Sequence, residues 1–366
     1  MRIKRVDVYR VELKYVEPFR IALGTSVVSH NVVVRVTSVD GAEGWGEGSP
    51  SRRILGDTID MAVRDAGRLA SKILELGDVE LEHLHEIAGR EEYSLSAVAA
   101  LDMALCDLKG KLAGTPIYRL FGGYRESLET DITIGIMEPE EMVKRAVKYV
   151  DMGFKALKLK LGEDPDTDIE RVRAVRDAVG EGITIRVDAN QGWTVEQAIR
   201  VIDRISGYDV ELVEQPVRYD DVEGLAKVRK ESPVPIAADE SAKKPSDVVR
   251  LARAEAVDIV NIKLMKAGGI WGALKVAAVS EACGIKNMVG CMGESRLGIT
   301  AGVHFALATR NVVYYDLDSD LLLAEDIVLS GGASIEKGVR KVADKPGLGI
   351  TSIDQAKLRK VASYER

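Results

Sequence analysis

Three acidic residues recur at a regular spacing in this chain, each at the end of a short apolar stretch. Asp188, Glu214 and Asp239 are separated by 26 and then 25 residues. Carboxylates brought together repel one another strongly, and a divalent cation removes that repulsion. Oxygen ligands without histidine or cysteine favour a hard ion, Mg²⁺ or in its place Mn²⁺. One such acid alone would more simply cap a following helix, but three in register predict a metal site.

Lysines could supply acid and base groups beside that metal. In the stretch Ala-Leu-Lys-Leu-Lys-Leu-Gly, an extended strand points Lys158 and Lys160 to one face and the leucines to the other. An isolated Lys-x-Lys would be a solvated edge strand, but the regular acidic strand ends that follow favour a polar interior. Further along the chain, the same alternation places Lys263 in the interior, with Lys266 in the loop after it.

The placement of these lysines suggests proton transfer. Lys263 lies four predicted strands from Lys160, so the two amines can approach a bound molecule from opposite sides. A neighbouring lysine and a metal disfavour the charged form, so we expect the pKa of Lys263 to fall, as a general base requires. The alternative is a buried lysine that only pairs with the acids. Two bases beside a metal suit removal of a proton α to a carboxylate and its return on either face, with the metal neutralising the charge of the enediolate.

The elements that must position these residues follow a repeated pattern. From about residue 129, a short apolar strand and an amphipathic helix alternate every 25 residues or so. The eight predicted strands are Asp131–Ile136, Ala156–Leu161, Thr184–Asp188, Val210–Glu214, Ile236–Asp239, Ile259–Leu264, Lys286–Gly290 and Val312–Asp316. This alternation predicts right-handed crossovers and a parallel sheet, and eight units favour a closed (β/α) barrel over an open doubly wound sheet. No G-x-G-x-x-G follows the first strand, which argues against a dinucleotide fold.

The segments before and after the barrel predict a second domain. Strands are predicted at Ile3–Leu13, Asn31–Ser38 and Glu43–Glu47, loops at Val16–Ser29 and Gly48–Thr58, and helices between Thr58 and Leu120. After Asp316 the chain becomes irregular and then strand-like, at Ile327–Leu329 and Gly338–Val342. We therefore predict an α+β capping domain over 1–125, a barrel with the active site over 126–318, and a tail over 319–366 that returns to the capping domain.

Composition narrows the class of protein. The net charge of −7 and the pI near 5.4 give no reason to expect nucleic acid or an anionic membrane as a partner. No run of about eighteen apolar residues occurs, and the N-terminus alternates like a strand and not like a signal peptide. Cys106, Cys283 and Cys291 are too scattered for a disulfide framework or a zinc site, which indicates a reducing cytoplasm. We expect a cytoplasmic homo-oligomer with a small-molecule substrate.

Together these residues resemble the enolase superfamily, in its muconate-lactonizing branch. The matching motifs are Lys158-Leu159-Lys160, Val187-Asp188-Ala189-Asn190, Glu214-Gln215-Pro216, Asp239-Glu240-Ser241 and Asn261-Ile262-Lys263, with Ala100–Lys111 similar to its capping-domain helix and Pro346–Gly349 to its C-terminal signature. The resemblance implies a modified TIM barrel of (β/α)7β type with an α+β capping domain. It also implies the Mg²⁺ ligands Asp188, Glu214 and Asp239. Lys160 and Lys263 are then the acid/base pair, and Lys158 neutralises a substrate carboxylate and lowers the pKa of Lys160.

The mandelate-racemase branch of that superfamily would need a histidine base at the end of the seventh strand. That position holds Gly290-Cys291-Met292-Gly293, and His304 lies later, within a predicted helix. We therefore interpret the four histidines as ordinary surface or core residues.

Within the lysine branch, Asp316-Leu317-Asp318 is similar to the Asp-x-Asp of dipeptide epimerases, which holds the α-ammonium group of the substrate. Two carboxylates at one strand end, beyond the metal, suit an organic cation, although a helix or loop cap would also explain them. Ile54–Thr58 is similar to the capping loop of those epimerases. The resemblance further implies substrate contacts at Thr133, Cys291 and Gly293.

In the L-Ala-L-Glu-specific members, an arginine of the first capping loop meets the glutamate side chain. The nearest positions here, 22–24, are Ala-Leu-Gly, and only Arg20, Arg52 and Arg53 lie nearby, so an apolar or other second residue is as compatible. We predict a Mg²⁺-dependent isomerase that epimerises dipeptides by two-base 1,1-proton transfer through an enediolate. Three related activities are alternatives: o-succinylbenzoate synthase, N-acylamino-acid racemase and muconate cycloisomerase. A protein that binds metal without catalysis is the alternative from another class.

Overall fold

A computed structural model describes all residues of the chain, 1–366, and its centre is a sheet of parallel strands. The strands neighbour one another in chain order. Their bounds are β5 (Ile132–Ile134), β6 (Ala156–Lys160), β7 (Thr184–Asp188), β8 (Val210–Glu214), β9 (Ile236–Ala238), β10 (Ile259–Lys263), β11 (Lys286–Gly290) and β12 (Val312–Tyr315). The Asp131 amide donates to the Tyr315 carbonyl at 3.1 Å and so links the first strand of the sheet to the last. The predicted eight-stranded barrel is confirmed.

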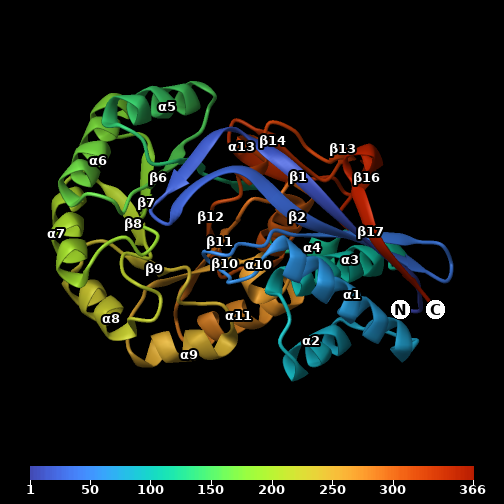
Figure 1. Cartoon of the computed structure of the whole chain (residues 1–366). Helices are drawn as coiled ribbons and strands as arrows, with labels where there is room; N and C mark the ends of the chain where they lie inside the picture. The colour runs from blue at the N-terminus through green and yellow to red at the C-terminus, as the bar shows by residue number, and fades with distance from the viewer.

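Helices follow the strands on the outside of this sheet, as right-handed crossovers require. They are α5 (Pro139–Asp151), α6 (Pro165–Val179), α7 (Val195–Ser206), α8 (Val222–Glu231), α9 (Pro245–Arg253), α10 (Leu264–Ala267), α11 (Ile270–Ala282), α12 (Arg296–Ala308) and α13 (Ser319–Leu322). Figure 1 shows α5 to α9 as an arc, green to yellow, outside β6 to β9. Several of these helices begin at a capping side chain, such as Thr194, which accepts from the Gln197 amide. Such caps fix where each helix starts, and therefore the loop that carries each strand-end residue.

The N-terminal region forms a separate antiparallel sheet, which also contains the end of the chain. Its strands, in the order β17-β1-β2-β3, are β1 (Ile3–Ile21), β2 (Gly24–Ser38), β3 (Glu43–Gly48) and β17 (Arg359–Glu365). The helices of this region are α1 (Ile59–Leu76), α2 (Leu81–Arg90), α3 (Leu95–Leu112) and α4 (Ile117–Leu120). The remaining elements are β4 (Leu128–Glu129), β13 (Val328–Gly331), β14 (Ala333–Glu336), β15 (Val339–Val342), β16 (Ile350–Ile353) and the 3-10 helix Gln355–Lys357. Because β17 pairs with β1, the two termini lie side by side (Figure 1).

The loop predicted over Val16–Ser29 is wrong. β1 and β2 continue through this segment as a long hairpin, in which Phe19 pairs with Ser26. The pairing register shifts between Lys14 and Phe19, and this irregularity breaks the alternation by which a strand is recognised in a sequence. The second predicted loop, Gly48–Thr58, is present between β3 and α1. The hairpin and this loop both contribute residues to the cavity described below.

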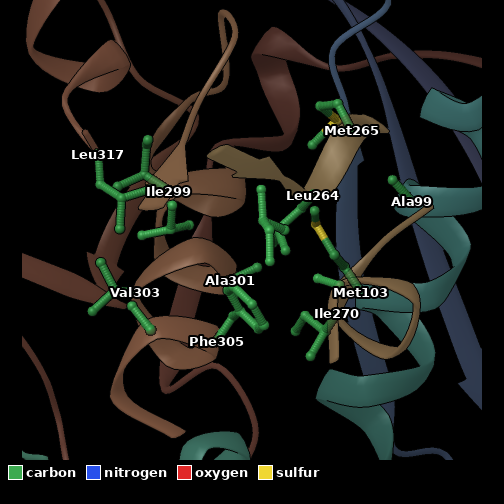
Figure 2. Packing of buried hydrophobic residues seen from close by; sticks show 14 of the residues in the cluster. Ala99, Met103, Leu264, Met265, Ile270, Ile299, Ala301, Val303, Phe305 and Leu317 are labelled. Atoms are coloured by element: carbon green, nitrogen blue, oxygen red, sulfur yellow. The ribbon is translucent and has the colours of Figure 1, made fainter. Parts of the chain in front are cut away.

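Apolar packing joins the capping region to the barrel. Figure 2 shows Met103 of α3 beside Leu264, which begins α10 directly after the strand that carries Lys263. On its other side α3 packs against β3, where a Cβ added at Gly46 would lie 2.0 Å from the Ala100 carbonyl oxygen. Only a glycine permits this approach of the strand to the helix backbone. The capping region is thus held against the segment that follows Lys263.

His304, on α12, makes the stability of this fold depend on pH. The imidazole is completely buried, and its Nδ1 accepts the Tyr118 amide at 3.2 Å. Burial lowers the pKa of His304 from 6.5 to about 4. Between these pH values the unfolded chain takes up a proton that the folded chain does not, so stability falls as the pH falls through this window, by up to about 3 kcal/mol.

Urea unfolding measures this effect. Between about pH 7 and about pH 4.5, His304→Gln should lose less free energy of unfolding than the wild type, because glutamine does not titrate there. An equal loss in the two proteins would contradict the assignment.

Candidate active site

The three predicted acids meet at the ends of neighbouring strands. Asp188 ends β7, Glu214 ends β8, and Asp239 follows β9 directly. One carboxylate oxygen from each lies within 4.8 Å of the others, and all three side chains are completely buried. Burial, together with the charge of Asp188, raises the pKa of Glu214. Burial also acts to raise the pKa of Asp239, but Lys263 and Lys266 outweigh it and lower that pKa. Carboxylates at this separation require positive charge near them.

The donor set fits a hard divalent cation. The nearby buried oxygens that accept no hydrogen bond are Asn190 Oδ1, Glu214 Oε2, Asp239 Oδ1, Glu240 Oε2 and Asn261 Oδ1. Lysine ammonium groups lie near those of Glu214 and Asp239 without the geometry of a hydrogen bond. Buried polar atoms in folded proteins are nearly always paired, so the oxygens of Asn190, Glu240 and Asn261, which have no partner, suit a cation held beside them. Carboxylate and amide oxygens are the ligands that Mg²⁺ prefers.

Lys160 and Lys263 reach these acids from two sides. Lys160, on β6, places Nζ 2.5 Å from Asp188 Oδ2. Lys263, on β10, places Nζ 2.9 Å from Asp239 Oδ2. The two strands are four apart in the sheet, and both lysines line one cavity at the carboxyl end of the barrel. The structure therefore brings two amines and the acidic cluster to one place.

The prediction that the pKa of Lys263 falls is wrong for the protein groups alone. Burial acts to lower the pKa of Lys263, but the negative charges of Asp239 and Glu214 raise it by more, so the net direction is upward. The ion pair with the acids, which is the alternative named in the sequence analysis, decides the direction, because the charges of Asp239 and Glu214 outweigh both burial and the neighbouring Lys158. A neutral base at this position therefore requires that another cation neutralise those acids.

Two further lysines lie behind the acids. Lys158 is completely buried and pairs with three carboxylates: Glu214 at 2.7 Å, Asp316 at 2.6 Å and Asp188 at 3.3 Å. It does not line the cavity, so its ammonium group bridges protein carboxylates, and its predicted contact with a substrate carboxylate stays a prediction. The prediction that Lys266 lies in a loop is wrong. It lies in the short helix α10, where its buried ammonium group contacts Asp239. The turn after β10 is helical and folds this side chain back under the rim.

A cavity of about 340 Å³ lies between the barrel rim, the β1–β2 hairpin and the loop after β3. The residues predicted to bind substrate that line it are Thr133, Cys291, Gly293, Asp316 and Asp318. Apolar side chains, among them Phe19 and Leu322, line other parts of its wall. This volume is in the range of small-molecule sites.

Asp316 and Asp318 form a second acidic pair, next to β12. The Thr133 amide donates to Asp318 at 2.6 Å, and the Thr133 hydroxyl donates to Asp316 at 3.3 Å. Burial, with the charge of Asp316, raises the pKa of Asp318 to about 6. Burial acts in the same direction on Asp316, but Lys158 outweighs it and lowers the pKa of Asp316 to about 2. These two side chains and Cys291 are close enough to hold a metal ion, but burial raises the pKa of the thiol and leaves it a poor ligand. An organic ammonium group fits the pair better.

Arginines near the mouth of the cavity differ in their surroundings. Arg20 pairs with Glu163 at 2.6 Å and does not line the cavity. Arg52 and Arg53 line it, and neither pairs with a carboxylate. The Arg53 guanidinium lies over Gly24, where an added Cβ would come within 2.7 Å of its Cζ. Positive charge therefore faces the outer part of the cavity, which disfavours a cationic substrate side chain there.

Three buried residues at the site, Asn190, Glu240 and Glu47, make contacts that the sequence pattern does not predict. Asn190 lines the cavity with a φ of 41° and donates to Glu240 at 3.2 Å. Both lie within two residues of a predicted metal ligand, so the matching motifs contained the signal. Glu47 of β3 caps α12 by accepting from the Gly298 amide at 2.8 Å and the Ser295 hydroxyl at 2.7 Å. Glu47 has no sequence signal for this role, because the α12 groups that it caps lie about 250 residues away.

Two family models match the chain. Residues 4–122 match the model described as mandelate racemase / muconate lactonizing enzyme, N-terminal domain. Residues 141–356 match the model described as enolase C-terminal domain-like.

Known proteins are similar to this chain over nearly its whole length. The L-Ala-D/L-Glu epimerase of Bacillus subtilis (strain 168) is 42% identical over 96% of this chain and 97% of its own. The hydrophobic dipeptide epimerase of Enterococcus faecalis (strain ATCC 700802 / V583) is 41% identical over 96% of this chain and 100% of its own. The crystal structure of the dipeptide epimerase from Enterococcus faecalis V583, complexed with Mg and the dipeptide L-Leu-L-Tyr, has a TM-score of 0.92 at 39% identity and covers 96% of this chain and 100% of that one.

Proposed function

This chain belongs to the mandelate racemase / muconate lactonizing enzyme family of the enolase superfamily, and from that premise we propose that it is a Mg²⁺-dependent dipeptide epimerase. Such an isomerase inverts the α-carbon of the C-terminal residue of an L,L-dipeptide by 1,1-proton transfer. The observation that carries the proposal is that one cavity is lined both by the two lysines that contact the buried acids and by a second pair of carboxylates. Lys160 and Lys263 flank an acidic metal cluster, and Asp316 and Asp318 offer negative charge to an ammonium group. Relatives about 40% identical are named dipeptide epimerases, which supports it.

Lys160 and Lys263 exchange a proton with the α-carbon from opposite faces. One lysine in its neutral form takes the proton, and the other, as an ammonium group, returns a proton on the other face. The strands that carry the two lysines are four apart in the eight-stranded sheet, so the amines approach from opposite sides. The stereocentre is inverted because the proton leaves from one face and returns on the other. The reverse reaction exchanges the roles of the two lysines.

Asp188, Glu214 and Asp239 are the proposed ligands of Mg²⁺, or of Mn²⁺ in its place. The bound ion supplies a fixed positive charge that stabilises the enediolate and lowers the barrier to proton removal. Neutralised acids no longer hold Lys160 and Lys263 as ion pairs. Asp239 and Glu214 then raise the pKa of Lys263 less, and a lower pKa is what a neutral base requires.

Asp316 and Asp318 orient the substrate by its α-ammonium group. Thr133, Cys291 and Gly293 complete this part of the cavity wall. An N-acylated amino acid, a succinylbenzoate precursor or muconate has no free ammonium group, so the acidic pair favours a dipeptide over the substrates of the three alternative activities.

Incorporation of solvent deuterium tests the proposed function. The protein is incubated with mixed L,L-dipeptides and Mg²⁺ in D₂O, and the dipeptides are read by mass spectrometry. A gain of about 1 Da identifies the accepted substrates, because the returned proton comes from a lysine that exchanges with solvent. No gain in any dipeptide, from protein whose circular dichroism shows a folded chain, would exclude the proposal.

A double substitution separates dipeptide epimerisation from its alternatives. Asp316→Asn combined with Asp318→Asn keeps the shape of the site and removes both negative charges. We expect kcat/KM for dipeptides to fall by about 10²- to 10³-fold, because the substrate ammonium group loses its charged partners. Steady-state kinetics on an N-acylated amino acid is the comparison, and that activity should not fall. An equal loss on both kinds of substrate would contradict the role given to the pair.

We also propose the division into a capping domain (1–125), a barrel (126–318) and a tail (319–366), supported by the separate sheets and by the pairing of β17 with β1. Three cysteines without disulfide partners support a cytoplasmic location. None of the helices is both long enough and apolar enough to cross a membrane. The homo-oligomer stays a prediction, which light scattering after size-exclusion chromatography measures.

A further inference from the structure

We infer that Thr130 and Arg340 are positioning residues that hold Asp316 and Asp318 toward the cavity by fixing the peptide between them. Neither residue lines the cavity, so each acts through Leu317. The inference rests on the proposed function, because it concerns the acidic pair that receives the substrate ammonium group.

Both polar groups of the Leu317 backbone bond to side chains from other parts of the chain. The Leu317 amide donates to Thr130 Oγ1 at 2.9 Å. The Leu317 carbonyl accepts from Arg340 Nε at 2.6 Å. Thr130 lies between β4 and β5, and Arg340 lies on β15, so these partners are 187 and 23 residues away along the chain. The segment after β12 is therefore held from both sides.

The Leu317 side chain is fixed on the core side of the same segment. In Figure 2 it lies beside Ile299 of α12, and Leu317 is 1% exposed. A Cβ added at Gly302 would come within 2.8 Å of Leu317 Cδ2, so the leucine packs directly on the helix backbone. With its side chain, amide and carbonyl all held, this residue cannot rotate, and both flanking aspartates stay at the cavity wall.

The Arg340 guanidinium donates only to the segment that contains Leu317 and Asp320. It is completely buried, and besides Leu317 it pairs with Asp320 on α13, with Nη1 at 3.2 Å. The central strand of a three-stranded sheet carries it, with Leu128 opposite on β4 and Ile335 opposite on β14. A buried guanidinium is retained where its donors are used. The C-terminal tail thus supports the ammonium site without touching the cavity.

Substitutions at the two positions separate positioning from general stability. Thr130→Val removes the acceptor oxygen at nearly constant shape, and Thr130→Ser retains it. Arg340→Met removes the donors of the guanidinium. Arg296→Met is the matched control. Arg296 lies on α12 and donates to the Val328 carbonyl in the tail, but it makes no bond to Leu317.

Inhibition constants of two unreactive analogues measure recognition of the ammonium group. One is a dipeptide that ends in 2-aminoisobutyrate, which has no α-proton, and the other is the same molecule without its amino group. The measured quantity is the inhibition constant of the analogue without the amino group divided by that of the analogue with it. This ratio should fall at least about fivefold in Thr130→Val and Arg340→Met, while KM for a dipeptide rises and kcat stays within about threefold of the wild type. Thr130→Ser and Arg296→Met should keep the wild-type ratio within about twofold.

A merely structural role would weaken both analogues equally and leave the ratio unchanged. An unchanged ratio in folded Thr130→Val would overturn the inference, and this variant decides the matter where Arg340→Met does not fold. If the wild type neither exchanges dipeptide protons nor prefers the amine, the proposed function fails instead.

Discussion

Replacing Lys160 or Lys263 with alanine should lower kcat for dipeptide epimerisation by about 10³-fold or more while the protein stays folded. Inversion needs a base on one face of the α-carbon and an acid on the other, so the loss of either amine stops both directions. The structure places the two ammonium groups in one cavity, in contact with Asp188 and Asp239. Chiral chromatography of an L,L-dipeptide and its L,D-epimer, each used as the starting substrate, gives the rates.

Isotope exchange in the same variants tests the assignment of faces. Each variant keeps the lysine that removes the α-proton of one epimer. In D₂O, Lys160→Ala should therefore exchange the proton of one epimer without inversion, and Lys263→Ala that of the other. Lys286→Ala, at the exposed start of β11, is the control and should behave as the wild type. Exchange of the same epimer in both variants would show that the lysines do not act from opposite faces.

The residues at the strand ends could be predicted because alternation along a strand translates directly into direction. The predicted bounds of β7, β8 and β11 coincide with those of the structure. In β6, the alternation that put Lys158 and Lys160 on one face is the arrangement observed, with Lys160 in register with Asp188 on β7. Parallel strands joined by crossover helices bring such ends to one rim, so their spacing in the sequence is enough to assemble the cluster.

Contacts between distant segments could not be obtained this way. The pKa of Lys263 depends on its pairing with Asp239, and a strand pattern gives direction but not the distance between two charges. Arg340 lies in an ordinary strand pattern that gives no sign of a fully buried side chain. Its burial depends on Leu317 and Asp320, which only the folded tail brings near it.

Among conservative single substitutions, Glu214→Gln should have the largest effect on the metal site. Glutamine keeps the size of the side chain and an oxygen that accepts from the Asn261 amide, now at 2.7 Å, but removes one of three charges. We expect Mg²⁺ affinity to fall at least about 10²-fold and kcat about 10³-fold, because the ion contributes several kcal/mol to stabilising the transition state. Titration calorimetry measures the affinity. Glu211→Gln, on the same strand but paired with Arg186 at 2.6 Å, is the matched control and should change neither.

Thermal unfolding separates loss of the metal from loss of the fold. An ion that binds only the folded chain stabilises it by about 2.7 kcal/mol at 100 times its Kd. Mg²⁺ should therefore raise Tm for the wild type and for Glu211→Gln, and much less for Glu214→Gln. In EDTA the wild type should stay folded, because Lys158, Lys160 and Lys263 already pair with the three acids. Its activity should disappear and return when Mg²⁺ is added. Two results would contradict the metal site: activity that survives EDTA, or stabilisation of Glu214→Gln by Mg²⁺ equal to that of the wild type. Either would show that these carboxylates only pair with the lysines. The two-base mechanism would then lack the metal charge that stabilises the enediolate.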